Sequence, residues 1–233
     1  MKRILLTLTV AAAAIMPASA DDFFSTDDPK QLFTFGARIG VNTSNRTISD
    51  SYFGIWNQNS WGTGFDLGVV ADLNIKNFIS IQPGFFYESR SGSFAYESTA
   101  FNEEGKPWIK PQLGKGRMYL FTIPVVASFH FNILDELRWN VDCGPYLQIK
   151  LRSTFDNKFE YPEASPTGMP EYIPGARTAK CDFGLKIGTG FDIFENYYIG
   201  VHYLAGFLHA WNPGKLGGHN KAWMFTIGYN LPL

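Results

Sequence analysis

The sequence predicts an all-β fold, an eight-stranded antiparallel transmembrane up-and-down β-barrel with short periplasmic turns and long extracellular loops. Three observations predict it. Apolar and polar residues alternate with period two in eight segments. The connections between these segments are alternately tight and long. Only 18% of the 233 residues are charged, whereas 16% are aromatic. This composition excludes intrinsic disorder, and a net charge of -1 argues against a nucleic-acid partner.

The first segment predicts a secretory signal peptide. Lys2 and Arg3 precede the apolar run 4–16, and the triplet Ala18-Ser19-Ala20 then supplies a small-residue cleavage site. We expect residues 1–20 to be removed on export, leaving 21–32 as a short periplasmic N-terminal segment and 33–233 as the barrel domain. Beyond residue 20 no apolar run approaches the ~18 residues of a spanning helix, which excludes a helical membrane protein.

Eight strands follow, each with one apolar face and one polar or glycine-rich face. In chain order they are 33–42, 64–73, 79–88, 119–130, 137–151, 181–191, 197–208 and 223–231. Their apolar faces start at Phe33, Phe65, Ile79, Tyr119, Leu137, Cys181, Tyr197 and Trp223. The fifth is the clearest, because every second residue from Leu137 to Leu151 is apolar. In the sixth, Thr189 is the one polar residue on the apolar face.

The surroundings of the apolar face separate a soluble barrel from a membrane barrel. A soluble barrel turns its apolar residues inward, whereas a membrane barrel turns them toward lipid and keeps polar residues inside. Here the polar face is poor in Lys and Glu and rich in Gly, which suits a narrow interior. Aromatic residues recur near strand ends on the apolar face, as interfacial girdles would: Phe33, Tyr87, Tyr119, Phe129, Trp139, Phe191, Tyr197, Phe207 and Trp223.

The lengths of the connections favour the outer membrane. The tight links are 74–77, 132–136 and 194–196, and the long polar segments are 44–61, 89–117, 152–179 and 209–220. Short turns on one side and long loops on the other are typical of outer-membrane barrels, and an even strand number leaves both termini in the periplasm. We therefore expect location in the cell outer membrane of a Gram-negative bacterium, with membrane lipid as a partner. A soluble lipocalin-like barrel is the alternative.

Five segments resemble the PorT-type outer membrane β-barrel family. They are 35–42 (FGARIGVN), 81–87 (IQPGFFY), 119–125 (YLFTIPV), 143–146 (CGPY) and 182–185 (DFGL). Thr122 departs from the family, which often carries an acidic residue before the Ile-Pro pair. The resemblance spans most of the chain and implies an eight-stranded barrel, but no shared activity, because architecture alone unites such families.

The C-terminus resembles the strand signal that outer-membrane assembly machinery reads. Every second residue from Trp223 to Leu233 is apolar, although that signal usually ends in an aromatic residue. We expect the assembly machinery to be a partner through this strand, with a chance strand end as the alternative.

Nine charged residues are expected to face the lumen, the interior of the barrel: Arg38, Asp66, Asp72, Glu88, Arg138, Asp142, Lys150, Asp182 and Lys186. Eight strands enclose only enough space for side chains, and isolated buried charges are costly. The sequence therefore predicts a paired, structural charge network that fills the lumen rather than a conduction path.

Cys143 and Cys181 have outward parity on neighbouring strands. If Leu151 pairs near Thr178, Cys143 lies opposite Lys186 and several residues from Cys181. A disulfide needs Cα atoms within about 7 Å. Free, lipid-facing thiols are therefore favoured over a disulfide.

The residues give little support to catalysis. No outward face combines Ser, His and an acid, as an activated nucleophile requires. His130 is expected at a periplasmic turn, His202 in the lumen, and His209 and His219 in the last long loop, with no zinc spacing. We expect a non-enzymatic structural or surface-interaction protein without cofactor or metal. Two alternatives stay open, a lipid-modifying barrel enzyme and an accessory component of a secretion or assembly complex.

Aromatic residues in the long loops are the remaining candidates for partner contacts. The second long loop carries Phe94, Tyr96, Phe101 and Trp108, and the third carries Phe155, Phe159, Tyr161 and Tyr172. They either extend the strands beyond the membrane or contact an unknown surface or periplasmic protein, because long loops often hold function.

Overall fold

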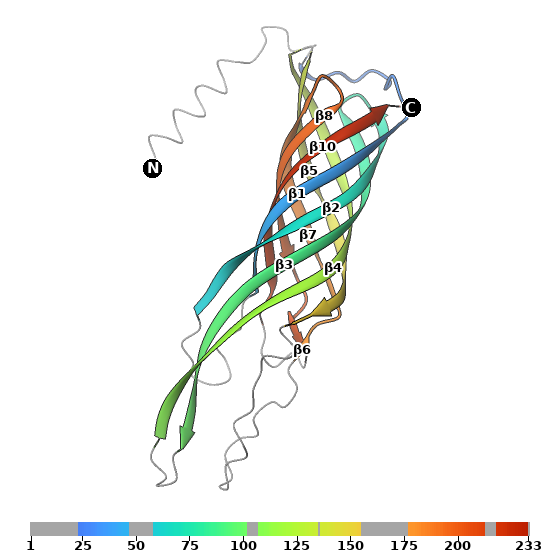
Figure 1. The fold of residues 1–233 in the computed structure, drawn as a ribbon. Coiled ribbons are helices and arrows are strands. Elements are labelled where there is room, and N and C mark those ends of the chain that lie inside the picture. The colour runs from blue at the N-terminus through green and yellow to red at the C-terminus, as the bar shows by residue number, and fades with distance from the viewer. Residues whose placement is uncertain are drawn as a thin grey trace.

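The computed structural model describes residues 23–46, 58–101, 107–134, 136–154, 177–212 and 218–232. Within them, eight long strands form one closed antiparallel barrel in the order β1-β10-β8-β7-β5-β4-β3-β2 (Figure 1). Two short strands, β6 (Arg177–Thr178) and β9 (Trp211–Asn212), pair with each other outside it. The barrel strands are β1 (Phe33–Arg46), β2 (Gln58–Lys76), β3 (Ile79–Phe101), β4 (Pro107–Leu134), β5 (Leu137–Ser153), β7 (Cys181–Ile193), β8 (Tyr197–Gly206) and β10 (Asn220–Pro232). The predicted fold class is confirmed.

The first and last barrel strands close the sheet. β1 pairs with β10 from Thr34↔Pro232 to Arg46↔Asn220 and with β2 on its other edge. Closure leaves no unpaired edge within the barrel, so the backbone groups at membrane depth find partners in neighbouring strands. No helix among the described residues is long and apolar enough to cross a membrane.

The predicted faces are confirmed. Along β5, burial alternates residue by residue, with Asp142 and Tyr146 buried and Leu147 exposed. Thr189 on the outward face has a structural partner, because its hydroxyl oxygen accepts a hydrogen bond from Trp139 Nε1 at 2.5 Å and donates to the Asn140 carbonyl at 2.8 Å. The hydroxyl therefore satisfies an indole N–H at the outer surface.

The outward face forms an apolar band with aromatic residues toward both ends. Near the long-loop end Tyr87 contacts Phe65 and Tyr119, with ring centroids 6.1 and 6.3 Å apart. Near the short-turn end Tyr197 and Tyr229 meet at 5.4 Å. Exposed residues of β10 from Trp223 to Leu231 rise by about 20 Å at a typical strand tilt, close to the ~25 Å band of outer-membrane barrels.

The prediction of a long loop over residues 89–117 is wrong, because most of these residues form strands. β3 and β4 stay paired from Arg90↔Met118 to Phe101↔Pro107, whereas β5 leaves β4 at Ser153↔Met118. Beyond this point β3 and β4 continue as a projecting hairpin, here called the arm, whose described residues are 91–101 and 107–117 (Figure 1). β2 stays paired with β3 as far as Gln58↔Ala95, so the arm is three-stranded at its base and two-stranded beyond it. Phe94, Tyr96, Phe101 and Trp108 lie in these strands, which confirms the strand-extension interpretation.

Two of the three predicted tight links are confirmed as turns, Asn77–Phe78 between β2 and β3 and residues 194–196 between β7 and β8. In the third, predicted at 132–136, residues 132–134 belong to β4 and Asp135 lies outside the described residues. In the β7–β8 turn Phe194 and Glu195 have φ values of 53° and 62°. The signal-peptide residues and the third-loop aromatics, Phe155, Phe159, Tyr161 and Tyr172, lie outside the described residues.

Cys143 and Cys181 are free and exposed on the outer face, as favoured from the sequence. The predicted register was wrong by one residue, since Cys143 faces Ile187 rather than Lys186, and Cys181 faces Ile149. The two cysteines are thus six residues apart along the paired strands, beyond disulfide reach.

Candidate functional site: the barrel lumen

An apolar layer crosses the lumen between its two ends. Its residues come from five strands and pack into one buried cluster. They are Val70, Phe86, Tyr146, Leu204, Ala222 and Met224. Phe86 is 2% exposed and Leu204 is fully buried. On each strand that contributes a residue, polar lumen residues follow on the periplasmic side, so this layer, the septum, separates a periplasmic chamber from an extracellular half.

The periplasmic chamber is a small polar cavity lined by Arg38, Asp72, Gln82, Ser128, His130, Arg138, Asn140, Asp142, Asp192, Tyr198 and Asn230. Gln82 donates to Asp72 at 2.8 Å, and Arg38 donates to Asn230 Oδ1 at 2.6 Å. The Arg38 guanidinium also lies over the Tyr198 ring, 4.3 Å from its centroid, a cation–π contact.

Asp142 is the centre of one hydrogen-bonded cluster in this chamber. Its Oδ1 accepts from the Ser128 hydroxyl at 2.5 Å, and its Oδ2 lies 2.8 Å from His202 Nε2. Tyr198 adds its hydroxyl at 3.5 Å from the same Oδ2. The carboxylate is therefore held by neutral and imidazole donors, as buried charges require.

A second chain of hydrogen bonds runs through His130. Asn140 Nδ2 donates to Asp192 Oδ2 at 2.8 Å, so the Asn140 oxygen faces His130 Nδ1, at 2.7 Å. Nδ1 must then carry the proton, which leaves Nε2 to accept from the Ser80 hydroxyl at 2.9 Å. This order of groups is that of a serine nucleophile, its base and an orienting residue, although Ser80 is 0% exposed.

Arg138 closes the chain at the periplasmic mouth. Its Nη2 lies 2.8 Å from Asp192 Oδ2, and its side chain is 39% exposed. His130 was expected at a periplasmic turn, but its side chain is buried in the lumen, because β4 continues past it to Leu134.

The extracellular half contains a buried ion pair on one strand. Arg90 Nη2 and Nε both lie 2.7 Å from Glu88 Oε2. The side-chain oxygen of Gln148 faces two donors, the Thr122 hydroxyl and the Arg90 guanidinium, and it accepts from Arg90 Nη2 at 2.6 Å. Arg90 thus bridges β3 and β5 directly above the septum.

Four predicted lumen residues lie apart from these clusters. Lys150 donates to the Thr178 carbonyl at 2.6 Å, at the extracellular end. Asp182 accepts from Asn220 Nδ2 at 2.8 Å. The Lys186 ammonium lies 5.1 Å from the Phe86 ring centroid. Asp66 is buried opposite Glu88, and neither of its carboxylate oxygens has a hydrogen-bond partner among the described residues.

The structure thus distributes the nine predicted charged residues through the lumen rather than in one network. The partners of Glu88, Arg138 and Asp142 are Arg90, Asp192 and His202, none of which belongs to the nine. Arg90 and Asp192 were missed because they lie just beyond the predicted strand ends. Continued period-two parity, from Glu88 to Arg90 and from Gly190 to Asp192, was the available signal.

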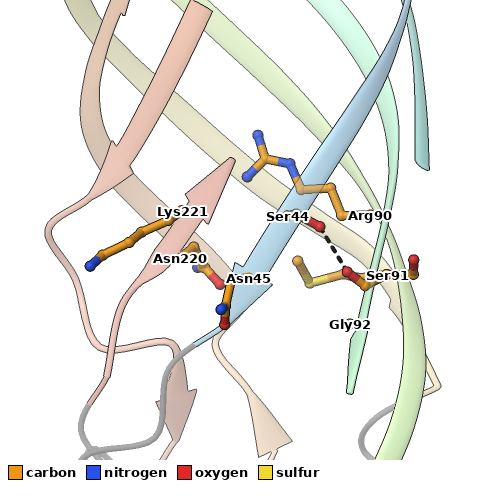
Figure 2. A pocket seen from close by; sticks show the side chains of 8 residues that line it. Ser44, Asn45, Arg90, Ser91, Gly92, Asn220 and Lys221 are labelled. Carbon is orange, nitrogen blue, oxygen red and sulfur yellow. Dashed lines mark hydrogen bonds between the residues drawn. The ribbon is translucent and has the colours of Figure 1, made fainter. Parts of the chain in front are cut away.

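A hollow at the extracellular mouth is lined by Ser44, Asn45, Arg90, Ser91, Gly92, Met118, Asn220 and Lys221 (Figure 2). Ser44 donates across it to the Ser91 carbonyl at 2.8 Å. Figure 2 shows that the cationic ends of Arg90 and Lys221 point in different directions. Because the two charges diverge, this hollow offers no convergent site for an anion.

Histidines outside the lumen also form no evident metal centre. The His209 and His219 rings stack with centroids 5.8 Å apart. Within the part of the chain that the structure describes, no group of three or more His, Cys, Asp or Glu side chains could hold a metal ion.

Solved structures with a similar fold include three outer-membrane proteins. Ail of Yersinia pestis, in complex with the heparin analogue sucrose octasulfate, is 15% identical and has a TM-score of 0.39, with 85% of this chain and 99% of that chain covered. OprG from Pseudomonas aeruginosa is 10% identical, with a TM-score of 0.48 and coverage of 89% and 99%. The outer membrane enzyme PagL is 12% identical, with a TM-score of 0.39 and coverage of 86% and 99%.

No curated protein matches the sequence. The profile of the outer membrane protein beta-barrel domain matches residues 24–210, which is most of the barrel described above. The chain therefore belongs to the outer membrane protein beta-barrel domain family.

Proposed function

We propose that this outer-membrane protein is non-enzymatic and serves a structural or surface-interaction role, with a lumen filled by side chains. The septum is the observation that supports the proposal, because a layer of buried apolar residues from five strands argues against an aqueous path for a solute through the lumen. A barrel of this size has room for side chains inside but not for a channel as well. The function then resides mainly in the parts of the protein that are exposed outside the membrane.

The arm is the feature best placed to meet a partner. From Arg90↔Met118 to Phe101↔Pro107, its paired strands extend about 35 Å at the usual rise per residue. It therefore projects well beyond the barrel rim, on the side of the long loops (Figure 1).

Prolines on the arm favour contact through its faces rather than through its edge. Pro107 and Pro111 lie on β4, whose outer edge from 107 to 116 has no neighbouring strand among the described residues. Proline lacks a backbone N–H, and the two residues share one parity, so that edge is a poor template for an added strand.

Removal of the arm tests this role. Replacing residues 96–112 by Asn-Gly joins Ala95 to Leu113, which pair directly, through a two-residue hairpin turn. We expect the shortened protein to fold, as judged by its heat-modifiable mobility on gels. Photo-crosslinking from benzoylphenylalanine at position 96 of the full-length protein on intact cells should yield adducts, and the same partners should be lost from purifications of the shortened protein. An unchanged set of partners would contradict the proposal.

We also propose that residues 1–20 are a cleaved signal peptide, that β10 is read by the assembly machinery, and that the chain is of the PorT type. The alternating lipid-facing residues of β10, from Trp223 to Leu231, support the second point. Mass spectrometry of the protein purified from outer membranes should find Asp21 as the first residue. A chain that retains residues 1–20 in the outer membrane would contradict the cleavage.

A hydrolase acting on lipids is the second candidate, and the Ser80–His130–Asn140 chain is the observation that favours it. PagL shows that a barrel of similar fold can be an enzyme. The complete burial of Ser80 argues against access by a substrate. Labelling by a fluorophosphonate that is abolished in Ser80→Ala, but kept in Ser128→Ala, would establish this candidate; no labelling would reject it.

A further inference from the structure

Residues 23–32 pack against the periplasmic end of the barrel. The Asn74 backbone N–H donates to the Leu32 carbonyl at 2.9 Å, and that of Asn77 donates to the Asp27 carbonyl at 3.1 Å. The Asn74 side chain adds a bond to the Gln31 carbonyl at 2.9 Å. This segment, here called the strap, therefore follows the β2–β3 turn through hydrogen bonds to its own backbone carbonyls.

The two faces of the strap differ. Asp28 is exposed and pairs with Lys76 Nζ at 2.6 Å, which holds the pKa of the Asp28 carboxyl below its usual range. Ser25 accepts from Asn77 Nδ2 at 3.2 Å. These polar groups lie on the turn side of the strap, in reach of water.

The other face is aromatic. Phe24 meets Phe78 with ring centroids 4.6 Å apart, and Phe23 stacks on Phe131 at 5.3 Å. Phe131 in turn contacts Trp139 at 5.2 Å. Phe131 and Trp139 have the outward parity of their strands, so this cluster covers the outside of β4 and β5 and not the lumen.

The aromatic face is continuous with the outward face of the barrel through Phe131, which contacts both strap phenylalanines and Trp139. Phe24 remains 42% exposed, and Leu32, directly before β1, is 56% exposed. Trp139 at this level is typical of the membrane–water interface. An amphipathic segment with an aromatic face is stable where headgroups meet acyl chains.

We propose that the strap is an interfacial anchor, whose Phe23 and Phe24 insert at the headgroup–acyl boundary of the periplasm-facing phospholipid leaflet while Asp28 stays in water. The occupant of this aromatic face is phospholipid and not a protein partner. The anchor would fix the β2–β3 turn at the membrane surface, and it is independent of any role of the arm.

Spin labels test the depth of the strap. A nitroxide is placed at Phe24→Cys, or at Asp28→Cys as the matched control, in a Cys143→Ala/Cys181→Ala background. The protein is reconstituted in vesicles of phosphatidylethanolamine and phosphatidylglycerol. We expect the label at position 24 to collide mainly with oxygen and that at 28 mainly with a water-soluble nickel chelate. Equal nickel accessibility at the two positions would overturn the proposal.

Hydrogen exchange tests the strap with its native side chains, since the label replaces one phenylalanine. In the same vesicles, the Asn74 and Asn77 amides should exchange about tenfold faster in Phe23→Ser/Phe24→Ser than in the unmodified protein, because their acceptors lie on the strap. The Asp28→Ser variant should keep slow exchange. Unchanged exchange in the phenylalanine double variant would overturn the anchor, as would an effect that is equally large in detergent without phospholipid.

Discussion

Glu88 and Arg90 show how single residues hold charge inside this barrel. Their side chains are 0% and 4% exposed and form a 2.7 Å ion pair just above the septum. A buried pair of this kind contributes little net stability compared with an apolar pair, because both ions lose their hydration. Removal of one partner is strongly destabilising, since the remaining charge stays buried and no water replaces the lost partner.

Arg90→Met should therefore destabilise the barrel by about 3–5 kcal/mol, because it leaves Glu88 buried and unpaired. The double variant Arg90→Met/Glu88→Gln should recover most of this loss, since no charge is then left alone. Urea unfolding followed by tryptophan fluorescence measures both values. If the double variant is no more stable than the single one, the ion pair is not the cause.

Glycines that face the lumen permit the close approach of neighbouring strands. A Cβ at Gly144 would lie 2.2 Å from the Val125 carbonyl oxygen, which is backbone. At Gly84 the nearest atom is the end of the Phe86 side chain, at 2.9 Å. A backbone atom moves only with its strand, whereas a side chain can rotate.

We predict that Gly144→Ala destabilises the barrel by about 1–3 kcal/mol, the range of overpacked cores, and that Gly84→Ala has the smaller effect. Parallel urea titrations of the two variants and the unmodified protein make the comparison. The reverse order of the two effects would contradict this interpretation of the narrow lumen.

At the scale of elements, the β7–β8 turn adopts an unusual backbone conformation. Phe194 and Glu195 both have positive φ, a region that costs a residue with a Cβ about 1–2 kcal/mol. The Phe194 N–H donates to the Glu136 carbonyl at 2.8 Å, so the neighbouring turn helps to hold this conformation.

Glu195→Gly should stabilise the protein by about 1 kcal/mol, because glycine adopts positive φ without steric cost. Glu195→Ala is the matched control and should give no gain, since it keeps the Cβ. Thermal unfolding monitored by circular dichroism measures the difference. Equal stability of the two variants would show that the turn is not strained at this residue.

Strand number, faces and turns could be predicted because lipid imposes strict alternation on every spanning segment. Strand ends could not be predicted so well. In the arm both faces lie outside the membrane, so the alternation fades and residues 89–117 resemble a loop. Arg90 and Asp192 were missed because the predicted strands ended one or two residues too early, and with them the partners of Glu88 and Arg138 were missed.

The register of β7 against β5 was predicted wrongly, and the grouping of side chains inside the lumen could not be predicted from the sequence. Pairing Cys143 with Lys186 set an outward residue against an inward one, which the alternation itself excludes, and Ile187 faces Cys143 instead. Shifts of two residues preserve both faces, and these are the registers that the strand pattern does not separate. Septum residues such as Val70, Phe86 and Leu204 were placed on the inward faces, but only the three-dimensional structure shows that they form one cluster.

At the scale of the whole molecule, the barrel is a closed wall with a layered interior. Polar clusters occupy both halves of the lumen, and the septum separates them. Most buried charges find partners in these polar clusters, whereas apolar packing concentrates in the septum, beside which the Lys186 ammonium lies over the Phe86 ring. A filled barrel is a rigid platform for the arm and the strap at opposite ends.

Planar-bilayer recording of the purified protein tests the closed lumen most directly. Membranes with inserted protein, whose insertion is verified by protease protection, should show no stable ion current above that of protein-free membranes. The double variant Phe86→Ala/Leu204→Ala, which thins the septum, should be the first to leak. Stable, sizeable single-channel currents from the unmodified protein would contradict the septum as a barrier and with it the proposed non-conducting role.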